Sequence, residues 1–248
     1  MPSIVATVGP ATAQHLIGQF PASFRERSAD LAFVVGVAGW LEWKFASMIE
    51  CFERAERGYA AAGNDERLLL ARAYRATVLL ALVRLDEATA LLDSVERATL
   101  PDTTRAVVLN AKSWLALEIG NLHAVAPLRS ELVDVLERVD RMDLWWHTTP
   151  PTRMPGLPGM TRPMMRHGKA LLRVAGDQPM ALRALGLLTQ AWCAMFQGRF
   201  PEARALVERA VAHGQWAGAT SAVRGHLLAL MSFMHAIAAI RAATMYST

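Results

Sequence analysis

The sequence is poor in cysteine, with two in 248 residues, Cys51 and Cys193. Each lies in a stretch with helical periodicity, and neither has a second cysteine three positions away. This arrangement excludes a disulfide framework and a cysteine-rich metal knuckle. We expect buried thiols in a reducing compartment, and therefore a cytoplasmic protein.

Long hydrophobic runs are also missing. The most apolar stretch lies between Arg224 and Arg241 and has 16 residues, short of the ~20 that a membrane-spanning helix needs. The N-terminus lacks the basic start and the long apolar core of a signal peptide. We therefore expect no association with a membrane.

Charge of one sign never accumulates along the chain. The formal net charge is +4, from 26 basic and 22 acidic residues, and no run of five like charges occurs. A nucleic-acid-binding domain gathers its positive charge on one face. The mixed pattern indicates solvated helix faces and predicts no direct contact with nucleic acid.

Motifs for catalysis or metal binding are absent as well. The seven histidines include no HExxH and no pair four residues apart, and the sequence has no GxSxG, SxxK or P-loop motif. We predict a non-enzymatic protein without metal or cofactor. A remote alternative is an enzyme whose site is assembled from scattered groups around His147, Arg153 and His167.

What the sequence does contain is a repeat with a period of about 39 residues. Five segments align without gaps, in steps of 40, 37, 38 and 40 residues. They begin at Phe45, Leu85, Leu122, Met160 and Phe200. Self-similarity at this period is typical of stacked helix pairs. No useful β-alternation occurs, so we predict an all-α, right-handed superhelix of antiparallel helix pairs.

Helix signals and breakers predict the individual helices. We expect a lead-in over 1–24 with one short helix, followed by a repeat domain over 25–248. The expected helices are 28–43, 45–62, 65–82, 85–98, 103–118, 122–139, 160–175, 179–196, 200–213 and 218–243. Four prolines in 142–159 predict an irregular segment in place of a helix there.

A second register supports the repeat. The residues nine positions before the repeat starts are Gly36, Ala76, Ser113 and Ala191, all of them small. The fourth repeat has Pro151 there. Small side chains at this position allow the two helices of a pair to approach closely.

The fifth repeat reads GRFPEARALVERA, a Gly turn and an aromatic residue followed by Glu-Ala and a later Ala. This pattern resembles the tetratricopeptide repeat, and the second repeat, RLDEATALLDSV, resembles it in part. The period of about 39 residues is longer than that of the standard tetratricopeptide repeat. With this period, residues 53–88 and 172–210 resemble the helical-repeat region of large LuxR-type transcriptional activators, the MalT-like group. The resemblance covers about 25–245.

In that family an ATPase module precedes the repeats and a DNA-binding helix-turn-helix follows them. This sequence carries no P-loop and no helix-turn-helix. The resemblance therefore implies the middle part, a domain that senses a small-molecule effector or binds a peptide or protein partner. The alternative is a stand-alone adaptor for a peptide or partner helix. A self-association surface formed by the apolar helix near 226–240, which would give a homodimer, would favour this alternative.

The irregular segment is also the first candidate ligand site. Trp145, Trp146 and His147 stand together and Arg153 follows. Tryptophan faces stack on sugars, apolar ligands or peptide side chains, and arginine anchors anions. The alternative is that both tryptophans fill the gap left by the broken helix.

Two further tryptophans are equivalent by register. Trp114 and Trp192 each precede a turn glycine by six residues, in first helices of their pairs. First helices line the concave side of tetratricopeptide-like arrays, so these rings are candidates for the floor of a groove. Packing in the core is the alternative interpretation.

Overall fold

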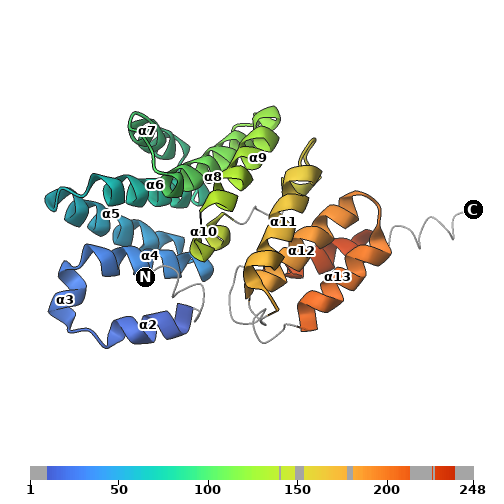
Figure 1. Ribbon diagram of the computed structural model, residues 1–248, viewed down its shortest axis with the longest axis horizontal. Helices are drawn as coiled ribbons and strands as arrows, with labels where there is room; N and C mark the ends of the chain where they lie inside the picture. The colour runs from blue at the N-terminus through green and yellow to red at the C-terminus, as the bar shows by residue number, and fades with distance from the viewer. Residues whose placement is uncertain are drawn as a thin grey trace, which may run out of the picture. The chain divides into compact units, whose positions relative to one another are not determined.

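The computed structural model describes residues 10–139, 141–148, 154–177, 181–212, 225 and 227–237. Within these residues the backbone forms helices and turns and no strand (Figure 1). The all-α prediction is confirmed. Arg153, Pro151 and His226 lie outside the described residues.

The helices follow the predicted order. They are α2 (Pro10–Gly18), α3 (Ala22–Arg27), α4 (Ala29–Leu41), α5 (Phe45–Ala61), α6 (Asp65–Ala81), α7 (Leu85–Glu96), α8 (Asp102–Glu118), α9 (Leu122–Arg138), α10 (Met142–His147), the 3-10 helix η1 (Met154–Gly156), α11 (Thr161–Ala175), α12 (Ala181–Phe196) and α13 (Phe200–Ala212). From α4 to α9 and from α11 to α13, each end falls within two residues of the prediction. Of the last predicted helix, 225 and 227–237 are described and helical. Helix α2 lies within the predicted lead-in, and α3 extends past residue 24, where the lead-in was predicted to end.

The chain divides into two compact units. The first unit comprises Met1–Thr149 with Pro158–Pro163, and the second comprises Pro150–Leu157 with Met164–Thr248. The divisions lie in or next to the segment 142–159. Each unit is described by itself below.

In the first unit, consecutive helices pack as antiparallel pairs. The pairs are α4 with α5, α6 with α7, and α8 with α9, while α6 also packs on α5 and on α8 (Figure 1). Phe52 of α5 and Tyr74 of α6 are fully buried where the first two pairs meet. Each pair therefore buries its apolar side on its neighbours, as in a helical-repeat solenoid. The handedness of the superhelix stays a prediction.

The turns inside the pairs share one backbone geometry. The second residue after the first helix has a positive φ in four pairs, at Trp43, Val83, Gly120 and Gly198. In the second pair, the Arg84 amide then donates to the Leu79 carbonyl at 2.9 Å. This bond is the 6→1 bond of a Schellman motif, and it satisfies a carbonyl that the helix end leaves unpaired. Glycine suits this position, yet two repeats place Trp or Val there.

The small residues of the second register are buried, at Gly36, Ala76, Ser113 and Ala191. At Gly36 a Cβ atom would come within 2.8 Å of the Phe52 ring. Because real Cβ contacts are longer than this, the α4–α5 pair could not close around a larger residue. The predicted close approach is confirmed at this position.

The segment 142–159 departs from the prediction at its start. Residues 142–147 form α10, a helix of six residues whose side chains are almost all buried. The expectation that the prolines exclude a helix is wrong for these residues. Pro150 restricts the backbone conformation of the residue directly before it and removes the hydrogen bond to the carbonyl four residues earlier. Neither effect reaches the helical turn that ends at His147, so that turn can still form.

Val83→Gly is expected to raise the free energy of unfolding by about 1 kcal/mol. Val83 is β-branched, has a φ of 61° and is 66% exposed, so the substitution relieves strain and removes little packing. Urea unfolding followed by circular dichroism measures the change.

The matched control is Gly120→Val. Gly120 has a φ of 76°, and an added Cβ would meet no other described atom within 4 Å, so the new side chain introduces strain without a clash. We expect this variant to lose about 1 kcal/mol. A destabilised Val83→Gly protein would contradict the strain argument.

Candidate functional site

The predicted site residues that the structure describes belong to two different units. Trp114 lies half-buried on α8, and Trp145, Trp146 and His147 are buried in α10, all in the first unit. Trp192 is buried in α12 of the second unit, and Arg153 lies outside the described residues. The two α10 tryptophans are thus interior side chains in this conformation.

Aromatic contacts link two of the predicted groups through a residue that the sequence did not single out. The Trp40 ring of α4 lies with its centroid 4.6 Å from that of His147 and 6.0 Å from that of Trp114. On another side, the Tyr74 ring lies 4.1 Å from the His147 ring. Aromatic side chains of α4 and α6 therefore pack against His147 of α10, and Trp114 of α8 packs on the Trp40 ring.

A charged side chain lies in the same interior. Arg129 of α9 is 1% exposed, and its Nη1 donates to Oδ1 of Asn110 at 2.8 Å. Its Nη2 donates to the carbonyl of Thr148 at 2.7 Å. Thr148 is the C-cap of α10, so the guanidinium sits at the partly negative end of that helix. One side chain thus joins α8, α9 and α10.

No carboxylate within the described part of the chain forms an ion pair with Arg129. Desolvation lowers the pKa of Arg129 to about 9, so the guanidinium remains charged at neutral pH. Buried arginines are normally paired with an acid, because an uncompensated buried charge is costly. This arrangement is the least expected feature of the first unit.

The buried acid of α10 already has a partner. Asp143 of α10 is buried and accepts two hydrogen bonds from Arg141, from Nε at 2.8 Å and from Nη2 at 2.7 Å. Burial and the charge of Asp143 raise the pKa of Tyr74 well above its ordinary value, so its hydroxyl stays protonated. With neutral His147, these described groups carry two cations and one anion, a net charge of one positive.

Several buried polar atoms in this interior have no hydrogen-bond partner among the described residues. They are the Tyr74 hydroxyl, Asn110 Nδ2, Trp114 Nε1, Trp146 Nε1, and both ring nitrogens of His147. Native interiors leave few such atoms, and each one calls for an explanation. Apart from one ring nitrogen of His147, every one of these groups is a donor. We call Tyr74, Asn110, Arg129 and His147, with the Trp40 ring, the Arg129 cluster.

The repeat register contains the signal that sequence reasoning missed. Seven residues after the repeat starts stand Phe52, Leu92 and Val207, all buried and apolar, but Arg129 in the third repeat. Twelve residues before the starts stand Phe33, Ala73 and Leu188, but Asn110 in the third repeat. Polar residues thus replace apolar ones at two core positions of the same helix pair. In the fourth repeat the same two positions hold His167 and Thr148, which are also buried and polar.

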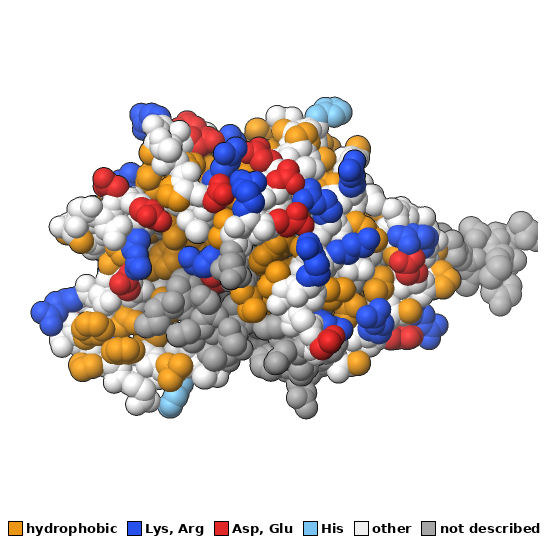
Figure 2. Space-filling view, in the orientation of Figure 1, with side chains coloured by type: hydrophobic (Ala, Val, Ile, Leu, Met, Phe, Trp, Pro, Cys, Tyr) orange, Lys and Arg blue, Asp and Glu red, His pale blue; other side chains and the backbone are white. Residues whose placement is uncertain are grey.

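Two of the hollows on the first unit are lined entirely by described residues. One has a volume of about 430 Å³ and lies among α5, α6 and α7. Its charged side chains pair with one another: Arg75 Nη1 lies 2.9 Å from Glu53 Oε1, and Arg75 Nε lies 2.8 Å from Glu56 Oε1. Burial raises the pKa of Glu56 above its ordinary value. Figure 2 shows acidic and basic side chains next to one another over these helices.

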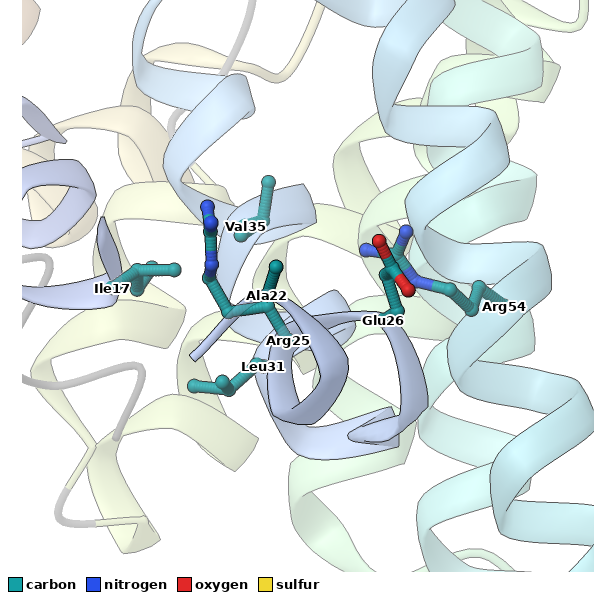
Figure 3. A pocket seen from close by; sticks show the side chains of 7 residues that line it. All are labelled: Ile17, Ala22, Arg25, Glu26, Leu31, Val35 and Arg54. Atoms are coloured by element: carbon teal, nitrogen blue, oxygen red, sulfur yellow. The ribbon is translucent and has the colours of Figure 1, made fainter. Parts of the chain in front are cut away.

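The other hollow has a volume of about 250 Å³ and is lined by helices α2 to α5. Figure 3 shows the seven lining side chains, among them Arg25 and Glu26 from α3 and Arg54 from α5. Ile17, Leu31 and Val35 supply its apolar wall. The hollow shares no residue with the Arg129 cluster.

In the second unit, Trp192 belongs to a separate aromatic group. Its ring stacks on Phe196 at 5.8 Å and meets Phe233 edge-on at 6.0 Å. Phe196 and Phe233 are exposed. An apolar surface therefore lies beside Trp192, and the predicted groove floor joining Trp114 and Trp192 stays a prediction.

Other chemistry finds little support in the described residues. They bring no three His, Cys, Asp or Glu side chains together as a metal-ligand set, and none of their helices has the length and apolarity to cross a bilayer. Burial raises the pKa of both thiols, to about 11 at Cys193, which keeps them protonated and unreactive. Comparison with protein-family models, curated proteins and solved structures found no match.

His147→Phe is expected to make the protein more resistant to acid. Desolvation lowers the pKa of His147 to about 3 in the folded state, against about 6.5 in the unfolded chain. Between these values only the unfolded chain binds the proton, so acidification favours unfolding. From pH 7 to pH 4 the wild type should lose about 3 kcal/mol more than the variant.

Urea unfolding at the two pH values measures this difference. Neither ring nitrogen of His147 bonds to a described residue, so phenylalanine should cost little at pH 7. The control is His123→Gln, which removes an exposed imidazole outside this interior. An unaltered pH dependence in His147→Phe would show that His147 is not the group that titrates.

Proposed function

We propose that this chain is a ligand-sensing helical-repeat domain of the kind found in LuxR-type, MalT-like transcriptional regulators. The Arg129 cluster carries the proposal. It places a cation, and several donors without a described partner, inside a stack whose equivalent positions are otherwise mostly apolar. Stability alone favours apolar residues at such positions, so their replacement by polar groups supports a binding role.

The packing of the repeats connects the Arg129 cluster to other helices, through which binding could affect other parts of a regulator. Arg129 contacts α8 and α10 at once, and α8 packs on α6. A ligand that changes the hydrogen bonds of Arg129 would therefore bias the packing of three helices. This is the effector-sensing role that the sequence resemblance implies.

An adaptor for a peptide or partner helix is the second candidate, and the α5–α7 hollow favours it. Arg72, Arg75 and Arg84 line this hollow together with Glu53, Glu56 and Glu87. A peptide with both acidic and basic side chains could exchange ion pairs with this surface. Such exposed pairs contribute about 0–1 kcal/mol each, so affinity would depend on many of them together.

A thermal-unfolding experiment separates the two candidates. An extract of the cells that make the protein is split by dialysis into small molecules and macromolecules, and each fraction is added to the purified chain. A sensor should show a dose-dependent rise in Tm with the small molecules, because a ligand at 100 times its Kd stabilises the folded state by about 2.7 kcal/mol. A rise with the macromolecules alone would support the adaptor. No rise with either would contradict both.

The regulator assignment has its own test in the DNA on both sides of the reading frame. An in-frame P-loop module upstream and a helix-turn-helix downstream would support it. Stop and start signals that isolate the frame would favour the stand-alone adaptor. A homodimer through the exposed Phe196 and Phe233 is checked by sedimentation of the purified chain.

A further inference from the structure

We infer that the hollow of about 250 Å³ among α2, α3, α4 and α5 binds a small monocarboxylate with an apolar body. Arg54 anchors the carboxylate, and Arg25 is a second cation beside it. We call this space the α2–α5 hollow. It shares no residue with the Arg129 cluster, so it adds a second binding site to the proposed sensing function.

The α2–α5 hollow has the volume that such a ligand needs. Its volume is about 250 Å³, whereas an apolar cavity of about 150 Å³ already holds benzene. A ring or a branched chain therefore fits together with one carboxylate. Figure 3 shows that the lining side chains come from four helices, with Ile17 on α2, Leu31 on α4 and Arg54 on α5.

The charge of the lining favours an anion. Two guanidinium groups, Arg25 and Arg54, and one carboxylate, Glu26, line the hollow, which leaves one positive charge in excess. Within the described ranges, neither guanidinium forms a hydrogen bond or an ion pair with another residue. A carboxylate would compensate the excess charge, and it can accept two parallel hydrogen bonds from one guanidinium.

One donor of this lining is already withdrawn from water. The Nε atom of Arg54 is buried and has no hydrogen-bond acceptor among the residues that the structure describes. A buried N–H group without an acceptor costs free energy, and an acceptor supplied by a ligand recovers that cost. This atom therefore identifies Arg54 as the anchor.

The apolar part of the lining determines the rest of the ligand. Leu31 is buried, Ile17 and Val35 are half-buried, and all three line the hollow. Covering these side chains removes apolar surface from water, which favours a ligand with a ring or a branched chain. Inorganic phosphate lacks such a body. A zwitterionic amino acid has one, but its ammonium group would leave the excess positive charge of the lining in place.

A bound ligand would also join the lead-in to the first helix pair. Helices α2 and α3 pack on α4, whereas Arg54 belongs to α5. Helix α3 has six residues and none of them is buried, so little packing of its own holds it in place. A carboxylate between Arg54 and Arg25 would hold α3 against α5, and trypsin should then cleave more slowly after Arg25 and Arg27.

The test titrates the purified chain at pH 7 with benzoate and phenylacetate, and with benzamide, phenylalanine and inorganic phosphate for comparison. Calorimetry measures affinity, and trypsin digestion measures the protection of α3. We expect saturable binding of at least one acid, with protection, and weaker or no binding of the other three compounds. Absence of saturable binding by both acids would overturn the assignment. So would equal binding of benzamide or tighter binding of phenylalanine.

Two variants with opposite expected effects assign the binding to the hollow. Arg54→Gln should weaken binding at least about tenfold, because it removes a charge-assisted hydrogen bond. The guanidinium has no described partner, so the stability of the ligand-free protein should hardly change. Glu26→Gln should tighten binding about two- to fivefold, because it removes a negative charge from the lining.

Arg57→Gln is the matched control. Arg57 lies on the same helix as Arg54, is exposed and does not line the hollow, so this variant should keep the wild-type affinity. Unchanged affinity in Arg54→Gln, or weaker binding in Glu26→Gln, would contradict the site. If the dialysable extract raises Tm but neither acid binds, the sensing function stands and the carboxylate site fails. If an acid binds but the extract has no effect, the carboxylate site stands and the sensing function fails.

Discussion

A guanidinium buried without a carboxylate among the described residues is the constraint on which the interior of the first unit depends. Desolvating an arginine costs several kcal/mol unless its charge is met nearby. Here the compensation comes from dipoles, the Asn110 side chain and the carbonyl that ends α10. Because those groups belong to different helices, α8, α9 and α10 must keep their relative positions for Arg129 to stay inside. The hydrogen bonds of Arg129 therefore fix the relative positions of these three helices, and the apolar side chains pack within that arrangement.

The exclusion of water from this interior has two further consequences. In a medium of low dielectric constant, the attraction between Arg129 and the α10 carbonyl is stronger than it would be in water. The same medium disfavours a second charge, which is why the pKa of His147 falls to about 3. The imidazole stays neutral beside Trp40 and Tyr74, and within the cluster Arg129 alone is charged. An imidazolium there would place a like charge in the same interior.

Periodicity predicts the helices because each repeat presents the same apolar stripe to its neighbours, and the stripe is local in sequence. It predicts the irregular segment from its prolines, but not that Met142–His147 forms a buried helix before the first of them. For that reason the sequence places Trp145 and Trp146 in a loop. Contacts such as Trp40 with His147 join residues 107 positions apart, and no local pattern encodes them. Arg129 and Asn110 are visible in the register, because each breaks a column of mostly apolar residues.

In a repeat protein, equivalent positions of different repeats can be compared, which separates residues that serve packing from residues that serve binding. Phe52, Leu92 and Val207 demonstrate what a core position of the second helix needs in order to pack. In the third repeat Arg129 occupies that position and Asn110 replaces an apolar residue in the helix that faces it, and the fourth repeat has the polar residues His167 and Thr148 at the same two positions. A single polar replacement could be tolerated by chance, but two that hydrogen-bond to each other require a paired change in both helices of one pair. Since apolar side chains of similar volume would pack at least as stably there, the pair is better explained by what the interior binds than by what holds it together.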